Sequence, residues 1–537
     1  MLRNYLKHTL RFLLAVLAFL FLYQKLRRHS YKMRWQEKNS KLNPTQATRS
    51  RIMSQRSPGV RLVNRVMTEI GGHLKLRQGF ALMLVVGVIV GLVSLGALGT
   101  WSPTLAASVT TPTLVVAAHD SSHPEGADYV CDGVNDEVQI NTAIAKLPAG
   151  GVVQLLDGTF TIGANAYVRL TSNVTVRGEG PALTTVSKVA SSGSYIVFYA
   201  DSGYGPYTNI SLVDMKINLG SQSSHVNPFW GDHVDGFLLS NVQVLSSSRE
   251  GLIYIQHSKH MQISGCLFDG VRIQISGGTK ANSADAIDSD DALVQGCTFK
   301  NTPTDEFALG NTCKHWRILN NTFLNCAHMA IDTCNSPDVL ISGNVVDGAC
   351  LSHSWDGAIY SEGGIRVTIT NNRVSNCPIS AGIMVSYQKW GYGHGGDILI
   401  DNNVVTNTRF GIAALGIPRV TISNNQISQT SWHGVLIEKK TVNGVTYYPN
   451  DCKVTNNSIS DFGKTVTYAS GVELNYCQRC QVSFNVIDGN NNANAVYGIR
   501  ETGNTDYSTI NNNIISKVRY SIGKVGAHTV VKDNVLQ

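Results

Sequence analysis

The sequence predicts an all-β solenoid, a right-handed parallel β-helix, and three observations support this fold class. Phrases that alternate β-branched and other residues and end in Asn return along the chain, such as WRILNN (ending at Asn321), VTITNN (Asn372) and CKVTNN (Asn457). From Asn321 the intervals are 23, 28, 31, 22, 32, 28, 28 and 21 residues. A nearly constant minimum with additions indicates coils of fixed circumference carrying loops of variable length. Composition agrees, because 50 Gly and only 15% charged residues suit short strands and tight turns.

A second repeated phrase predicts a further strand in each coil. It consists of a small residue followed by alternating apolar residues, as in Asp356-Gly357-Ala358 and His433-Gly434-Val435. Strands placed in register once per coil build a long parallel sheet down one face. We expect Asp356 to be an outward residue that solvates this sheet, and His433 to be a solvated histidine at a turn.

The first 113 residues precede the repeats and carry one or two hydrophobic membrane or signal segments. Residues 1–79 hold 17 Lys or Arg against two acids, with a marginal hydrophobic run at 12–23. Residues 80–101 carry no charge over 22 residues, enough to cross a bilayer, and a linker follows at 102–113. Either both runs insert and the basic loop is cytoplasmic, or translation begins near Met67 and 80–101 is part of an export signal. Both alternatives place the body outside the cell or on its surface, secreted or membrane-anchored.

Residues 114–537 form the predicted β-helix domain. Residues 136–147 place apolar side chains at helical spacing and predict a helix that caps the first open coil. At each bend we expect Asn to adopt left-handed backbone and to bond its counterpart one coil away. The eleven Cys recur near strand ends, which indicates small apolar residues stacked inside the solenoid. With 27 basic and 35 acidic residues beyond position 79, the domain does not have the charge of a nucleic-acid-binding protein.

The opening Tyr129-Val130-Cys131-Asp132-Gly133, followed by the capping helix, resembles the start of proteins in the pectin lyase-like β-helix superfamily. A stretch further on resembles the motif of polygalacturonase-like glycosidases. Asp285 and Asp288 are followed one coil later by Asp305-Glu306 and, after a further 23 residues, by His328. The order and spacing agree with that family, whereas the Asp-Asp pair has become Asp-Glu and the glycines beside the His are missing.

The resemblance implies a glycoside hydrolase acting on an acidic or pectin-like polysaccharide. Glu306 or Asp305 would be the general acid, Asp285 and the other carboxylate would hold the water, and His328 would tune their protonation. Four further residues are candidates for binding the substrate: Asp288, Arg366, and the loop aromatics Trp355 and Trp390.

Three alternatives stay open. The carboxylates can be an outward structural stripe, and the protein can be a polysaccharide lyase or epimerase, or a non-catalytic surface protein that binds glycans. The hydrolase needs no cofactor. A stripe of further acids could be plain surface or a Ca²⁺ site: Asp332, Glu438, Glu473 and Glu501. The expected partners are a polysaccharide and, through the N-terminal segments, a membrane.

Overall fold

The computed structural model describes residues 111–190, 195–201, 207–222, 226–247, 251–277, 289–302, 313–352, 354, 356–387, 395–523 and 526–537. The segments predicted to enter a membrane, 12–23 and 80–101, lie outside these residues. Among the residues that the structure describes, none forms a helix with the length and apolar character of a membrane span.

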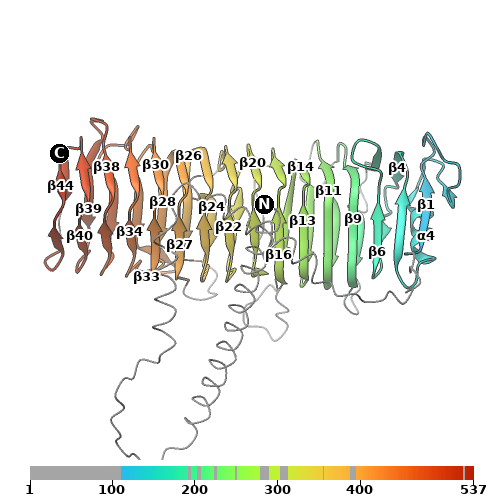
Figure 1. Ribbon diagram of the computed structural model, residues 1–537, viewed down its shortest axis with the longest axis horizontal. Helices are drawn as coiled ribbons and strands as arrows, with labels where there is room; N and C mark the ends of the chain where they lie inside the picture. The colour runs from blue at the N-terminus through green and yellow to red at the C-terminus, as the bar shows by residue number, and fades with distance from the viewer. Residues whose placement is uncertain are drawn as a thin grey trace, which may run out of the picture. The chain divides into compact units, whose positions relative to one another are not determined.

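The body from Val109 to Gln537 is one compact unit of stacked coils, with the strands running in order from β1 at one end to β44 at the other (Figure 1). Each coil contributes up to three strands, and every pairing between coils is parallel. The predicted β-helix is confirmed. We name the strands of a coil, in chain order, the first, second and third rows.

Two rows run along the whole unit. The first row contains β1(Thr113–Ala117), β3(Gly151–Leu155), β6(Val174–Arg177), β9(Tyr207–Asn218), β11(Val234–Leu245), β13(Lys259–Ser264), β16(Ser289–Gln295), β18(Cys313–Lys314), β19(Arg317–Leu319), β22(Leu340–Ser342), β25(Thr368–Thr370), β27(Ile398–Asp401), β29(Val420–Ser423), β34(Lys453–Thr455), β37(Gln481–Ser483), β40(Thr509–Asn511) and β43(Val530–Lys532). The second row contains β4(Gly158–Ile162), β7(Thr184–Lys188), the later parts of β9 and β11, β14(Leu267–Asp269), β17(Thr298–Lys300), β20(Thr322–Leu324), β23(Val345–Asp347), β26(Arg373–Ser386), β28(Val404–Leu415), β30(Gln426–Ser428), β35(Ser458–Ser460), β38(Val486–Asp488), β41(Ile514–Ser516) and β44(Val535–Leu536).

The third row is described in two runs. The first run contains β5(Val168–Arg169), β8(Ile196–Asp201), β10(Asn227–Asp232), β12(Gly251–Gln256) and β15(Val271–Ser276). The second run contains β21(Ile331–Asp332), β24(Gly357–Glu362), the later parts of β26 and β28, β31(Val435–Glu438), β36(Ala469–Asn475), β39(Ala495–Thr502) and β42(Tyr520–Gly523). Outside the rows, β2(Tyr129–Val130) pairs with β1, and β32(Lys440–Val442) with β33(Val445–Tyr447) forms an antiparallel hairpin.

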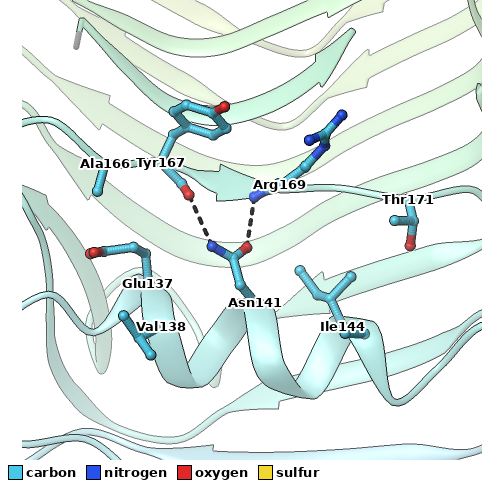
Figure 2. A pocket seen from close by; sticks show the side chains of 9 residues that line it. Glu137, Val138, Asn141, Ile144, Ala166, Tyr167, Arg169 and Thr171 are labelled. Atoms are coloured by element: carbon cyan, nitrogen blue, oxygen red, sulfur yellow. Dashed lines mark hydrogen bonds between the residues drawn. The ribbon is translucent and has the colours of Figure 1, made fainter. Parts of the chain in front are cut away.

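The predicted capping helix is α4(Glu137–Ala145), which closes the first coil. Its apolar face buries Ile140 and Ile144 against the first coils. The amide of Asn141 joins it to β5 by donating to Tyr167 O (3.1 Å) and accepting from the backbone N–H of Arg169 (2.8 Å), as Figure 2 shows. The cap therefore satisfies edge groups that no earlier strand could pair.

A buried asparagine ladder sets the register of the coils. The amide oxygen of Asn403 accepts both the backbone N–H (2.9 Å) and the side-chain N–H (3.0 Å) of Asn372, one coil earlier. The same bonds repeat at about one coil intervals from Asn321 to Asn534. The ladder was predicted, but the prediction gave a single Asn both the left-handed backbone and the bond to the next coil, and in the structure two neighbouring residues divide these roles. The ladder Asn is buried, whereas the residue before it, such as Asn402 (φ 53°), takes the left-handed conformation.

The interior is apolar, as the alternation of residues requires. Phe268, Phe299 and Phe323 stack in register with ring centroids 4.8 Å apart in successive coils. All eleven Cys are free and buried, and nine of them belong to the interior core, as predicted. Cys350 instead packs with Tyr360 and Met384 on the outer face, and Cys334 lies beside Glu362. Cys297 extends the asparagine ladder, because its backbone N–H donates to Asn321 Oδ1 at 2.9 Å.

Candidate active site

Most residues of the sequence-predicted site lie outside the described part of the chain. These are the four carboxylates and the two loop tryptophans: Asp285, Asp288, Asp305, Glu306, Trp355 and Trp390. Their roles remain predictions. His328 and Arg366 are described, and they lie in different settings.

Arg366 belongs to a row of alternating charges at the bends of successive coils. Its guanidinium donates to both carboxylate oxygens of Asp338 at 2.6 Å. The same bidentate pair joins Arg419 to Asp397 in a later coil and recurs between Arg479 and Asp451. These arginines have left-handed backbone, and the carboxyl pKa of Asp338 is lowered by its bond to Arg366. Arg366 therefore forms an ion pair with Asp338 that links two adjacent coils.

His328, by contrast, lies just before the third-row strand β21 and contacts a carboxylate of the next coil. Its Nε2 is 3.1 Å from Asp356 Oδ2, with 12% of the histidine side chain exposed. The chain then continues through β21 to Asp332, which pairs in register with Tyr360 of β24. Ile331 and Ile359 are buried in the core, so Asp332 and Tyr360 project from the opposite face. Glu362 follows two residues later on that same face.

We call Asp332, Asp356 and Glu362 the carboxyl cluster. Asp332 is 1% exposed, and its Oδ1 has no hydrogen-bond partner among the described residues. Asp356 and Glu362 lie nearer solvent, with side chains 28% and 20% exposed. The cluster therefore combines one buried carboxyl with two more accessible ones in the next coil.

Burial makes the cluster hold protons more tightly than ordinary carboxyls. Desolvation, followed by the charges of Glu362 and Asp356, raises the pKa of Asp332 well above its usual value. Burial also raises the pKa of Glu362, although the nearby Lys440 ammonium opposes the shift. Tyr360 keeps its proton too, because burial and these acids raise its pKa. A neutral acid beside an accessible carboxylate is the arrangement that general acid–base chemistry requires.

A lysine reaches this cluster from three coils away. Lys440 begins the hairpin β32–β33, and its ammonium donates to Ser386 Oγ at 2.8 Å and lies 3.7 Å from Glu362 Oε1. The Tyr360 hydroxyl is 2.7 Å from the same Ser386 Oγ. Stacking of Tyr387 on Tyr447 (3.5 Å between centroids) holds the hairpin against the coil. Burial lowers the pKa of Lys440, although Glu362 and Asp356 raise it.

An apolar surface continues from Tyr360 along the outer face of the later coils. Met384, Ala413 and Leu436 follow Tyr360 in register and are nearly inaccessible. Phe410 and Trp432 pack beside them, with ring centroids 5.3 Å apart. This outer face is therefore covered at these coils.

That cover explains why the expectation for His433 was wrong. The ring is 3% exposed, lies 4.8 Å from the Trp432 ring and accepts a hydrogen bond from Ser470 N. Desolvation lowers its pKa to about 3, so the ring is neutral. It is a structural histidine, not a solvated turn residue.

The stripe of further acids is also not plain surface. Glu473 is 3% exposed and binds the Arg500 guanidinium at 2.7 and 2.9 Å, while Glu501 is fully buried. Glu438 is half-buried and accepts a hydrogen bond from Asn475. The described groups whose spacing would allow metal binding lie elsewhere, at Asp232, His233 and His257 and at His123, Asp157 and Glu179.

Two family models match the chain. One, described as a right handed beta helix region, matches residues 351–534, and together with the stacked parallel coils it decides the class. The chain is a right-handed parallel β-helix protein. The β-helix fold that the resemblance implied is thereby confirmed. The other model, described as periplasmic copper-binding protein (NosD), matches residues 231–391.

Several solved structures resemble the β-helix. One is the A-module of mannuronan C-5 epimerase AlgE6 from Azotobacter vinelandii (17% identity, 76% of this chain and 96% of that chain, TM-score 0.39). Another is the catalytic unit of a GH87 alpha-1,3-glucanase from Streptomyces thermodiastaticus (16%, 73% and 65%, 0.44). A third is the surface protein and adhesin PfbA of Streptococcus pneumoniae (17%, 74% and 96%, 0.40). No curated protein matches the chain. The likeness concerns the fold and does not extend to activity.

Proposed function

We propose that this β-helix hydrolyses a polysaccharide at the carboxyl cluster. The observation that carries the proposal is a buried Asp332 that interacts electrostatically with two more accessible carboxyls of the next coil, Asp356 and Glu362. Glycoside hydrolysis needs one protonated and one ionised carboxyl group on either side of the scissile bond. An exported location, outside the cytoplasm, suits a polymeric substrate.

In this mechanism Glu362 is the general acid. Burial raises its pKa, so it retains a proton to give to the leaving glycosidic oxygen. After the transfer, the Lys440 ammonium at 3.7 Å stabilises the carboxylate that remains. Lys440 is itself held by Ser386, so the charge lies in place before the reaction begins.

Asp356 is the base. Its Oδ2 bonds His328 Nε2, which fixes the carboxylate, and the carboxylate takes a proton from the attacking water. Asp332 pairs in register with Tyr360 one coil away and acts as a positioning residue, because its buried carboxyl interacts electrostatically with the two reacting ones. His328 thus belongs both to this site and to the site predicted from sequence.

A lyase or epimerase is the second candidate, and Lys440 favours it. Burial lowers the pKa of its ammonium, and a lysine that can lose its proton removes the proton next to a uronate carboxylate. Tyr360 would then be a nearby proton donor. The lyase leaves unsaturated, ultraviolet-absorbing ends, whereas the hydrolase leaves only new reducing ends.

The test incubates the full-length protein with polygalacturonate, alginate and neutral α- and β-glucans, and measures reducing ends and ultraviolet absorbance. We expect Glu362→Gln and Asp356→Asn each to lower the rate of reducing-end release by about 10²–10⁴-fold. Glu438→Gln is the matched control. Glu438 is three coils further along the same outward column, is half-buried with a raised pKa, and lies away from Asp356.

Three results would overturn the proposal. The first is full activity in Glu362→Gln, and the second is an equal loss in Glu438→Gln. The third is activity lost in Asp305→Asn with Glu306→Gln but kept in both cluster variants, which would move the chemistry to the carboxylates predicted from sequence. Glycan binding without any release of products from any polymer would favour the non-catalytic surface protein.

A further inference from the structure

A second cluster of ionisable side chains lies at the opposite half of the solenoid, in the first run of the third row. β10 ends at Asp232 and β12 ends at Gln256, and these two residues are register partners in adjacent coils. The next residue in each coil is a histidine with left-handed backbone, His233 (φ 56°) and His257 (φ 49°). The two imidazoles therefore lie one above the other, with centroids 5.0 Å apart.

Each imidazole points its Nδ1 atom at the same carboxylate oxygen. Asp232 Oδ1 lies 2.8 Å from His257 Nδ1 and 2.9 Å from His233 Nδ1. The three candidate ligand atoms all lie within 4.8 Å of one another. The other carboxylate oxygen accepts a hydrogen bond from Gln256 Nε2 at 3.1 Å, which orients the group.

We propose that Asp232, His233 and His257 bind a divalent first-row transition-metal ion. Metal–ligand bonds to imidazole nitrogen and carboxylate oxygen are about 2.0–2.2 Å long. If the ion bound both Asp232 Oδ1 and His257 Nδ1, which are 2.8 Å apart, the angle between these ligands at the ion would be roughly 80–90°. This is close to the angle between neighbouring positions of an octahedron. Two histidines and one carboxylate are a common ligand set for these metals, and they leave positions open.

Three other groups of histidine and carboxylate side chains in the described chain show how this cluster differs. His260 pairs with Asp235 at 2.6 Å, and His315 pairs with Asp290 at 2.6 Å, each as one imidazole on one carboxylate from the previous coil. His123 contacts Asp157 through Nδ1 and Glu179 through Nε2, so that group offers a single imidazole. Among these sets, two imidazoles converge only at Asp232.

The site is open to ions from solvent. The side chains of His233, His257 and Asp232 are 37%, 21% and 14% exposed. Trp230 and Tyr254 precede Asp232 and Gln256 by two residues on the same face and contact each other with centroids 5.0 Å apart. An ion bound here would join adjacent coils beside an aromatic surface. This proposal is independent of the carboxyl cluster.

The test titrates Zn²⁺ and Co²⁺ into chelator-treated full-length protein by calorimetry, and follows the Co²⁺ visible spectrum. We expect one ion per chain and a metal-dependent rise in Tm. His257→Asn and Asp232→Asn should weaken the affinity by about 10- to 100-fold or more. Asn suits the left-handed backbone of residue 257, so the fold should persist.

His260→Asn is the matched control, because His260 also has left-handed backbone (φ 53°) and pairs with one carboxylate. It should leave the affinity unchanged. If the wild-type protein does not bind one metal ion per chain, the proposal is wrong, whatever the variants show. Binding that survives His257→Asn, or an equal loss in His260→Asn, would also overturn it.

Discussion

Removing one rung of the asparagine ladder should destabilise the β-helix far more than removing the residue beside it. In Asn403→Ala, the backbone and side-chain N–H groups of Asn372 lose their common acceptor, and Ile369 O loses a donor. Asn372 and Asn403 are buried, so water cannot replace these partners without rearrangement. Each buried group left unsatisfied costs about 1–3 kcal/mol, so the two lost donor bonds alone predict about 2–6 kcal/mol.

The measurement is urea denaturation followed by circular dichroism, with Asn402→Gly as the control. Asn402 is exposed and left-handed, and glycine adopts that backbone without strain. We expect the control to change the free energy of unfolding by less than about 1 kcal/mol. Equal midpoints for Asn403→Ala and Asn402→Gly would refute the view that the amide contacts set the stability of the stack.

Three further predictions concern pH and charge. Asp332→Asn should stabilise the fold increasingly above pH 4. The folded wild type keeps the Asp332 proton that the unfolded chain loses, so the two proteins diverge by about 1.4 kcal/mol per pH unit up to the raised pKa, as Tm series would show. His433→Gln should remove an acid sensitivity. The wild-type ring stays neutral down to about pH 3 when folded but charges near pH 6.5 when unfolded, so wild-type stability falls as pH drops through that window; parallel slopes for both proteins would contradict this. Arg419→Gln breaks an exposed pair with Asp397 and should cost no more than about 1 kcal/mol, a loss that vanishes in high salt.

The fold could be read from the sequence because each coil repeats the same local requirement. A bend needs a left-handed residue and a buried amide, and these demands leave Asn at near-constant spacing. The interior cysteines follow from the alternation of inward and outward positions, whereas the capping helix follows from apolar residues at helical spacing. What the spacing did not reveal is that the two bend functions fall on adjacent residues.

The carboxyl cluster was less accessible to this reasoning. Alternation places Asp332 on the outer face, and outward acids are normally solvated, yet the outer face is covered here and the carboxyl is buried. Lys440 contacts Ser386, 54 residues away, because a hairpin folds back over two coils. Asp356 sits in a generic Asp-Gly phrase, and only its contact with His328 distinguishes it. Such contacts depend on the conformations of loops, which do not follow the sequence repeat and so cannot be predicted from it.

Because of the ladder, a single coil is also a unit that can be inserted or deleted, which would lengthen or shorten the β-helix. Successive rungs are separated by 21 to 32 residues, yet the bond from one rung to the next stays at 2.9–3.0 Å. The length of the segment between two ladder asparagines therefore does not change the hydrogen bonds that join them. Excising residues 404–425 would present Asn457 to Asn403 with the same amide that Asn425 now offers, and the strands of all three rows would meet new partners in the old register. Gain or loss of whole coils thus changes the length of the β-helix, whereas the asparagine hydrogen bonds between neighbouring coils are kept.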